Sequence, residues 1–313
     1  MSTQTTHAIV ATAYGGPEVL DLVAVDVPSP GPGEVAVDVR AAGVNPYDVK
    51  VYAGLFGTDP AKLPMRLGSE GAGVVAGVGP DVDGVAIGDE VICFPAGGTY
   101  AERIVVPVTG LTPKPADLAW EQAAGLMLTG AAAVHALTAA RVGEGDTVLI
   151  HNGAGGVGQM ALQLAVARGA TVIATAAPAH HDLVRELGGI PVTFGDGLLE
   201  RARDAAPTGV TAALDLIGTD EAMDVSLALV GDRDRIATIA NFDRGPREGV
   251  KVLGAGGDPG TDVRNAARTE LAALAGAGKL RVRVDRTFPL AETADAHRYV
   301  ATGSASGKVV LLP

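Results

Sequence analysis

The chain has very little cysteine, few aromatic residues and fewer basic than acidic side chains. Of 313 residues only Cys93 is a cysteine, aromatic side chains make up 4%, and 24 basic side chains accompany 36 acidic ones, for a formal net charge of −12. A single cysteine excludes an intramolecular disulfide and a cysteine-rich metal site, and it is typical of the reducing cytoplasm. The negative charge opposes binding to nucleic acid or to an anionic membrane surface. We therefore expect a cytoplasmic protein with a small-molecule substrate and a locally built site for any anion.

Long apolar runs are also scarce. The N-terminus, MSTQTTHAIVATAYGG, has neither a basic leader nor a long apolar segment, so it does not resemble a signal peptide. The most apolar stretch, residues 123–140, is alanine-rich and contains Gly125, Gly130 and His135, which favours a buried helix over a membrane span. With 47% apolar and 19% charged residues the composition is that of a folded protein. The length predicts two domains.

The pattern of apolar residues changes twice along the chain. Residues 1–122 are predicted as an all-β core of short strands, of which EVAVDVRAAGV at 34–44 is the clearest. From 123 to 260, short apolar runs alternate with helix-like stretches, which indicates an α/β fold with a parallel sheet covered on both faces. Its six expected strands are DTVLIHNG, TVIATAA, IPVTF, AALDLIG, RIATIAN and VKVLGAG. Residues 261–313 return to a helix, a strand, a second helix and a last strand, GKVVLLP.

A glycine motif lies between the first of these six strands and the helix expected after it. In VLIHNGAGGVGQMALQLA, Gly153, Gly155 and Gly158 fill the G-x-G-x-x-G pattern of dinucleotide-binding turns. The first glycine allows a tight turn, the second lets a pyrophosphate approach the backbone, and the third lets the helix pack against the strand. Amides at the helix N-terminus then bind the phosphates, even in an acidic chain. A structural turn is the alternative, because the chain has 43 glycines.

An acidic residue is missing where NAD-preferring sites bind the adenosine ribose. Such sites place Asp or Glu about 20 residues beyond the glycine motif, but none occurs between Asp146 and Asp182. The positions at and after the end of the second strand are neutral or basic: Thr175, Ala176, His180, His181 and Arg185. Imidazole and guanidinium groups can donate hydrogen bonds to a 2′-phosphate. The sequence therefore predicts NADPH as the cofactor. The alternative is that His180 and His181 are ordinary exposed residues at a helix start.

Together these segments resemble the medium-chain dehydrogenase/reductase superfamily, specifically its zinc-independent quinone oxidoreductase branch, which includes zeta-crystallin. The resemblance extends over nearly the whole chain, through ATAYGGPEVL, AAGVNPYDVKVYAGLF, LGSEGAGVVAGVG, GDEVICF, GGTYAE, EQAAGLMLTGAAAVHAL, HNGAGGVG and TGSASGKVVLLP. It implies a GroES-like catalytic domain made of residues 1–122 and 261–313, with a Rossmann NADP-binding domain, residues 123–260, inserted between them. It also implies a homodimer.

The resemblance further implies that no catalytic zinc is bound. Zinc alcohol dehydrogenases of this superfamily carry a cysteine where this chain has Asn45 and a histidine where it has Ser69. A catalytic zinc needs about three protein ligands, and the cysteine-rich structural zinc lobe is missing from the sequence as well. Asp48 and Glu70 are retained, and we interpret them as structural carboxylates rather than catalytic ones.

The candidate site residues also follow from the resemblance. Asn45 is expected to donate to the substrate, and Tyr47, Lys50 and Tyr52 to orient the substrate or relay a proton, with packing or surface exposure as the alternative for the tyrosines. Further cofactor contacts are expected at Thr129, Gly156, Val157, Ile217, Gly218, Ile239, Ala240, Asn241, Gly254 and Lys308. The segment LGAGG at 253–257 would border the nicotinamide. Related reductases often carry an arginine just before the glycine where this chain has Ser306, so the basic contact to the 2′-phosphate is either supplied by Lys308 or missing.

Without a metal, the available chemistry is hydride transfer from a nicotinamide to a conjugated acceptor, followed by protonation. We therefore predict an NADPH-dependent, zinc-independent oxidoreductase acting on a quinone or an α,β-unsaturated carbonyl. One alternative is a cofactor-binding redox sensor or structural protein with little turnover. Another is an enzyme acting on an alkenal, a haloacrylate or an enoyl thioester.

Overall fold

The computed structural model describes residues 4–254, 260–303 and 305–313. The chain divides into two compact units, Met1–Leu128 with Thr269–Pro313, and Thr129–Arg268. Both boundaries lie inside helices, α3 (Met127–Ala139) and α9 (Gly260–Gly276), which explains why no linker sequence marks them. The domain limits expected from the sequence, after residues 122 and 260, lie shortly before these boundaries and stay a prediction.

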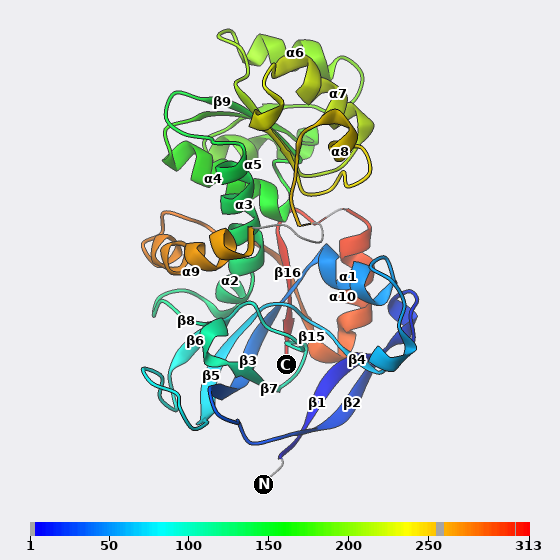
Figure 1. Cartoon of the computed structure of the whole chain (residues 1–313), viewed down its shortest axis with the longest axis vertical. Helices are drawn as coiled ribbons and strands as arrows, with labels where there is room; N and C mark the ends of the chain where they lie inside the picture. Colours follow the sequence, from blue (N-terminus) through cyan, green and yellow to red (C-terminus); the bar gives the residue numbers. More distant parts are fainter. Residues whose placement is uncertain (1–3, 255–259, 304) are drawn as a thin grey trace. The chain divides into compact units, whose positions relative to one another are not determined.

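The first unit is built on two sheets, with strand orders β2-β1-β4 and β15-β16-β3-β5-β6-β8, and β7 also pairs with β3. Its strands are β1 (Gln4–Ala11), β2 (Leu20–Val27), β3 (Glu34–Val44), β4 (Met65–Arg66), β5 (Gly71–Val78), β6 (Glu90–Cys93), β7 (Arg103–Pro107), β8 (Leu111–Pro113), β15 (Val284–Pro289) and β16 (Lys308–Leu312). Figure 1 shows the red C-terminal strand β16 beside the blue strand β3, with Val309 opposite Val44 in antiparallel register. Both ends of the chain therefore form one sheet.

Helices interrupt the all-β core predicted for residues 1–122. The unit contains α1 (Pro46–Tyr52), α2 (Trp120–Ala124) and α10 (Thr293–Ala301), with single 3₁₀ turns η1 (Pro17–Val19), η2 (Pro60–Lys62), η3 (Val108–Gly110) and η6 (Leu290–Glu292). Helix α1 has recognisable start signals, because Asn45 is the N-cap, Pro46 follows it, and the Asp48 carboxylate accepts a hydrogen bond from the Asn45 amide at 3.0 Å. The prediction of strands alone was wrong here because it did not take these short-range signals into account.

The core of the first unit consists of β3 side chains such as Val35 and Val37, together with Tyr52, Tyr100 and Phe288. Cys93 lies in β6 and is buried, and burial raises the pKa of its thiol to about 12. The thiol is therefore protonated and shielded at neutral pH.

The second unit contains one six-stranded sheet in the order β11-β10-β9-β12-β13-β14, and every neighbouring pair is parallel. Its strands are β9 (Thr147–His151), β10 (Thr171–Thr175), β11 (Ile190–Val192), β12 (Ala212–Asp215), β13 (Ile236–Thr238) and β14 (Lys251–Val252). Each of the six apolar runs thus forms a strand, as predicted. The order is that of the doubly wound dinucleotide-binding sheet, whose ligands bind beyond the carboxyl ends of the strands.

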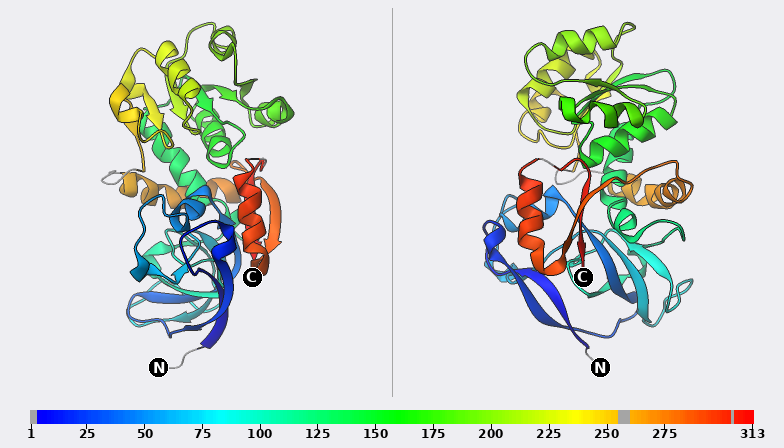
Figure 2. Two further views of the ribbon diagram at one scale, coloured as in Figure 1. Left: turned by 90° about the vertical axis from the view of Figure 1, so that its right-hand side faces the viewer. Right: turned by 180° about the vertical axis from the view of Figure 1, so that it is seen from behind.

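Helices lie on both sides of this sheet in Figure 2. They are α4 (Gly156–Ala167), α5 (His181–Glu186), α6 (Leu198–Ala205), α7 (Asp220–Leu229) and α8 (Gly245–Glu248), with η4 (Pro178–His180) and η5 (Arg233–Arg235). The strands β9, β12 and β13 are buried on both faces, which accounts for their continuous apolar runs. Among the described helices, none is both long and apolar enough to cross a bilayer.

Candidate active site

The glycine motif forms the turn between β9 and α4. A Cβ atom added at Gly158 would lie 2.0 Å from the carbonyl oxygen of Asn152, and one at Gly153 would lie 2.5 Å from Cβ of Ala174. Only glycine therefore lets the helix start so close to the strand. Gly155 is the N-cap, so the first-turn amides, including those of Gly156 and Val157, belong to the set that an α-helix leaves without an intrahelical partner. This turn has the form required for a pyrophosphate.

Two predicted cofactor contacts lie at the end of β10, and one of them holds that turn. The Thr175 hydroxyl accepts a hydrogen bond from the Asn152 amide at 2.9 Å, and the Ala176 amide donates to the Val192 carbonyl at 3.0 Å. Both side chains are buried. Thr175 thus holds the glycine turn at Asn152, whereas Ala176 joins the ends of β10 and β11.

The three candidates for the 2′-phosphate have different surroundings. Nε2 of His181 lies 3.3 Å from the Ala176 carbonyl oxygen, so this ring faces the strand ends. Arg185 is exposed and forms an ion pair with Asp182 at 2.7 Å, one helical turn earlier. His180 is half-buried. Asp182 thus partly balances the charge of Arg185, and phosphate binding by these residues stays a prediction.

The loops after β12 and β13 are held together by two buried polar side chains. Asp215 ends β12, and its carboxylate accepts from the amides of Ile217 (3.1 Å) and Gly218 (2.7 Å) and from the Thr238 hydroxyl (2.9 Å). The Thr238 oxygen in turn accepts from the amides of Ala240 at 3.2 Å and Asn241 at 2.9 Å. The predicted segments 217–218 and 239–241, Ile239 included, therefore lie side by side. The sequence analysis missed Asp215, although its signal was an acid ending the apolar run AALD.

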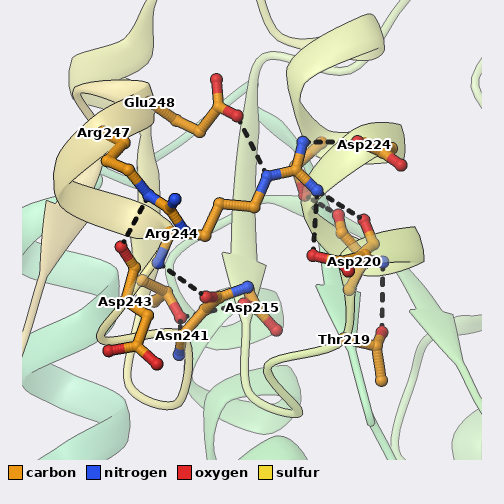
Figure 3. A network of polar contacts seen from close by, with 12 residues as sticks. Asp215, Thr219, Asp220, Asp224, Asn241, Asp243, Arg244, Arg247 and Glu248 are labelled. Carbon is orange, nitrogen blue, oxygen red and sulfur yellow. Dashed lines mark hydrogen bonds and ion pairs between the residues drawn. The ribbon is translucent and has the colours of Figure 1, made fainter.

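An arginine stabilises the same region from outside. Figure 3 shows the Arg244 guanidinium between Glu248 (3.0 Å), Asp220 (3.1 Å) and Asp224 (2.5 Å). Hydrogen bonds to these three carboxylates raise the pKa of Arg244 above its ordinary value. The Arg244 backbone amide also donates to Asn241 Oδ1 at 3.1 Å. Arg244 thereby connects the loop after β13 to the first turn of α7.

The remaining cofactor candidates of the second unit are placed in part. Thr129 lies buried in the first turn of α3. Gly254 follows β14 with a φ of +83°, a conformation that favours glycine. Residues 255–257 of the predicted LGAGG segment lie outside the described residues.

In the first unit, Asn45, Glu70 and Lys308 form a buried group that we call the Lys308 cluster. The Lys308 ammonium donates to Asn45 Oδ1 (2.6 Å), Glu70 Oε1 (2.8 Å) and the Val44 carbonyl (3.3 Å). Nδ2 of Asn45 donates to Glu70 Oε1 (3.1 Å) and the Gly43 carbonyl (3.3 Å). All three ammonium protons of Lys308 are used inside the unit, and its contact with the 2′-phosphate stays a prediction. Both amide protons of Asn45 are used as well, so Asn45 has none left for a substrate in this arrangement.

A second buried carboxylate lies beside this cluster. Asp48 accepts from the Ser69 hydroxyl (2.5 Å), the Tyr100 hydroxyl (2.9 Å) and the Asn45 amide (3.0 Å). Burial raises the pKa of Asp48, and these hydrogen bonds together with the charge of Lys308 oppose that rise. Asp48 and Glu70 both connect separate elements, as expected for structural carboxylates.

The three remaining catalytic candidates divide into one buried and two exposed residues. Tyr52 is completely buried in the core, and its hydroxyl lies 3.0 Å from Nδ1 of His297. Helix α1 thus directs Tyr52 inward, which favours the packing alternative, and a role in orienting the substrate or relaying a proton stays a prediction. Tyr47 is 50% exposed and packs on Phe56 with ring centroids 5.5 Å apart, and Lys50 is exposed one turn later. Residues three apart share a helix face, so α1 presents a hydroxyl and an ammonium together.

A β-rich unit containing a buried polar cluster, combined with a doubly wound sheet and a glycine turn, defines the two-unit oxidoreductase class. Residues 31–116 match the family described as alcohol dehydrogenase GroES-like domain, and residues 193–311 match the family described as zinc-binding dehydrogenase. The quinone oxidoreductase of Pseudomonas aeruginosa is 34% identical to the chain, over 96% of this chain and 98% of that protein. The chain therefore belongs to the medium-chain dehydrogenase/reductase superfamily, among its quinone oxidoreductases.

Other similar proteins cover a range of activities. The spectinabilin polyketide synthase system protein NorB of Streptomyces orinoci is 38% identical over 96% of this chain, which spans only 14% of that protein. A solved NAD-dependent alcohol dehydrogenase has a TM-score of 0.87 and 30% identity, covering 98% of this chain and 99% of that one. A mycobacterial protein solved with NADPH has a TM-score of 0.85 and 31% identity, covering 98% and 100%.

The Lys308 cluster does not fit a zinc ion, although one matching family is described as zinc-binding. The Lys308 ammonium lies within hydrogen-bond distance of Asn45 Oδ1 and Glu70 Oε1, so a divalent cation at the same oxygens would meet a like charge. Ser69, at the position of a family histidine, donates its proton to Asp48. Nowhere in residues 4–254, 260–303 and 305–313 do three or more His, Cys, Asp or Glu side chains form a group able to hold a metal.

Proposed function

We propose that the chain is an NADPH-dependent oxidoreductase that transfers hydride to a quinone or an α,β-unsaturated carbonyl without zinc. The observation that carries this proposal is the pair of exposed donors on α1, Tyr47 and Lys50. Within the described part of the chain neither polar end has a hydrogen bond or an ion pair, so both remain available to a ligand. The family membership and the quinone oxidoreductase of P. aeruginosa support the same reaction class.

The chemistry of the acceptor explains why two hydrogen-bond donors suffice. A quinone or enone that gains a hydride carries the negative charge on a conjugated oxygen, and protonation of the reduced product completes the reaction. Donors placed at that oxygen stabilise the transition state more than the ground state. We assign this task to the Tyr47 hydroxyl and the Lys50 ammonium, in place of Asn45 and Tyr52, whose polar groups are used internally.

The second unit offers the cofactor site. When bound, NADPH supplies the hydride. The turn formed by Gly153, Gly155 and Gly158 has the close approach that a pyrophosphate requires, since a Cβ at Gly158 would clash with the backbone. The acid-free interval after β10 and the complex of the mycobacterial relative with NADPH support the phosphorylated nucleotide. We also propose a cytoplasmic homodimer, from the single cysteine and the family resemblance.

A panel of acceptors tests the reaction. NADPH should be oxidised by 1,4-benzoquinone or 1,2-naphthoquinone in the presence of a chelator. Tyr47→Phe and Lys50→Met should each lower kcat/KM by about 10- to 100-fold, because each removes one donor to the developing charge. Lys62→Met is the matched control, since Lys62 is an exposed lysine in the same unit. Cofactor binding without oxidation across quinones and enones would instead favour the redox sensor or structural protein.

Nucleotide preference has a separate test. Replacing His180, His181 and Arg185 by alanine should weaken NADPH binding more than NADH binding, because the 2′-phosphate loses its donors. Titration of the intrinsic fluorescence of each nucleotide measures both dissociation constants. Equal weakening would show that these side chains do not bind the 2′-phosphate.

A further inference from the structure

The Lys308 cluster contains a buried ammonium group, that of Lys308, which has no role in the reaction proposed above. The Lys308 side chain is 4% exposed and that of Glu70 is 0% exposed, and their charged atoms are 2.8 Å apart. Isolated buried charges are costly, and a buried pair persists where its geometry and hydrogen bonds are good. Here the three ammonium protons meet three acceptors, and the second Glu70 oxygen accepts from the Leu128 amide at 2.8 Å.

Two glycines provide the space for this pair. A Cβ at Gly125 would lie 2.8 Å from Cγ and 3.0 Å from Cε of Lys308, and one at Gly43 would lie 2.8 Å from Glu70 Oε1. The two distances of 2.8 Å are shorter than non-bonded atoms tolerate without displacement. The backbone around the pair is thus shaped for a long basic side chain against a carboxylate.

The cluster is connected directly to the helix that carries the proposed donors. Asn45, which accepts from the Lys308 ammonium, is the N-cap of α1, and Tyr47 and Lys50 lie in that helix. Without Lys308, two carboxylates, Glu70 and Asp48, would remain at the start of α1 with no cation bonded to either. Their negative charge would oppose an acceptor oxygen that itself becomes negative.

We propose that Lys308 is a positioning residue for the proposed reaction: its ammonium balances the buried charge of Glu70 and fixes Asn45, and through Asn45 the start of α1. This inference rests on the proposed function for its catalytic consequence.

A comparison of single and double variants tests this inference in the full-length protein. Lys308→Met should lower kcat for a quinone by about 100-fold, because the start of α1 would shift and misplace Tyr47 and Lys50 at the acceptor oxygen. Glu70→Gln combined with Lys308→Met should recover about tenfold of that loss, because the uncompensated carboxylate is gone. Lys114→Met is the matched control, since Lys114 is also 4% exposed and pairs with Glu90 at 2.8 Å in the same unit.

The outcomes separate the inference from the proposed function. The inference is supported if Lys308→Met lowers kcat and the double variant recovers part of it. Lys114→Met must also keep kcat within about twofold of the wild type while its unfolding midpoint falls by about as much as that of Lys308→Met. Wild-type kcat in folded Lys308→Met, or no recovery in the double variant, would overturn the inference. If none of the tested quinones and enones supports NADPH oxidation by the wild type, the proposed function fails. The inference is then judged by the unfolding midpoints, and Lys308→Met must unfold at a lower temperature than the double variant.

Discussion

Replacing Tyr52 by phenylalanine separates a structural tyrosine from a catalytic one. Its hydroxyl lies 3.0 Å from Nδ1 of His297, whose Nε2 has no hydrogen-bond partner among the described residues. Both side chains are fully buried. Phenylalanine keeps the ring contact, at a centroid distance of 5.4 Å, but leaves the imidazole without its remaining partner. An orphaned buried polar group costs about 1–3 kcal/mol. A loss of about 2 kcal/mol should lower the unfolding midpoint by about 4–8 °C in a unit of this size.

The assay combines thermal unfolding with steady-state kinetics. Tyr52→Phe should unfold at lower temperature and retain the kcat of the wild type, because burial raises the pKa of Tyr52 to about 12 and the neutral hydroxyl does not reach the surface. Tyr47→Phe is the mirror-image control, since its half-exposed hydroxyl should affect kcat and leave stability unchanged within about 0.5 kcal/mol. A Tyr52→Phe variant with wild-type stability and a large loss of kcat would refute the structural role.

Two further predictions concern the glycine turn and acid stability. Gly158→Ala should raise the dissociation constant for NADPH at least about tenfold, or about 1.4 kcal/mol, because relieving a 2.0 Å contact with Asn152 displaces the start of α4. Gly143→Ala is the control, since a Cβ there meets nothing within 4 Å. Equal binding of NADPH by both variants would contradict the prediction. Burial lowers the pKa of His297 from 6.5 to about 4, so the unfolded chain binds its proton more readily. The stabilisation from the neutral ring is complete above about pH 6.5 and is lost as the pH falls towards 4. The free energy of unfolding, measured with urea at a series of pH values, should fall less steeply between pH 6.5 and 4 in His297→Gln than in the wild type. An equally steep fall in both proteins would disprove the assignment.

Local patterns in the sequence were sufficient for much of the fold. The run EVAVDVRAAGV coincides with β3, and each of the six apolar runs of the second unit contains a strand. For β9, β12 and β13, burial on both faces leaves a continuous apolar signal that needs no distant partner. The glycine turn was predictable for the same reason, since its close approach is made between residues six apart, Asn152 and Gly158. Helix α1 was predictable in principle from Asn45, Pro46 and Asp48.

The site of the first unit depended on contacts between distant parts of the chain. Lys308 reaches Asn45 across 263 positions because β16 pairs antiparallel with β3, and no local pattern encodes that register. The same holds for Tyr52 and His297, which are 245 positions apart. By itself the sequence determined the strands, the glycine turn and the residue types available for chemistry, because these rest on local periodicity and backbone sterics. Only the tertiary structure decided that Lys308 neutralises a buried carboxylate and that Tyr52 lies in the core, because burial and charge pairing are properties of the packed chain.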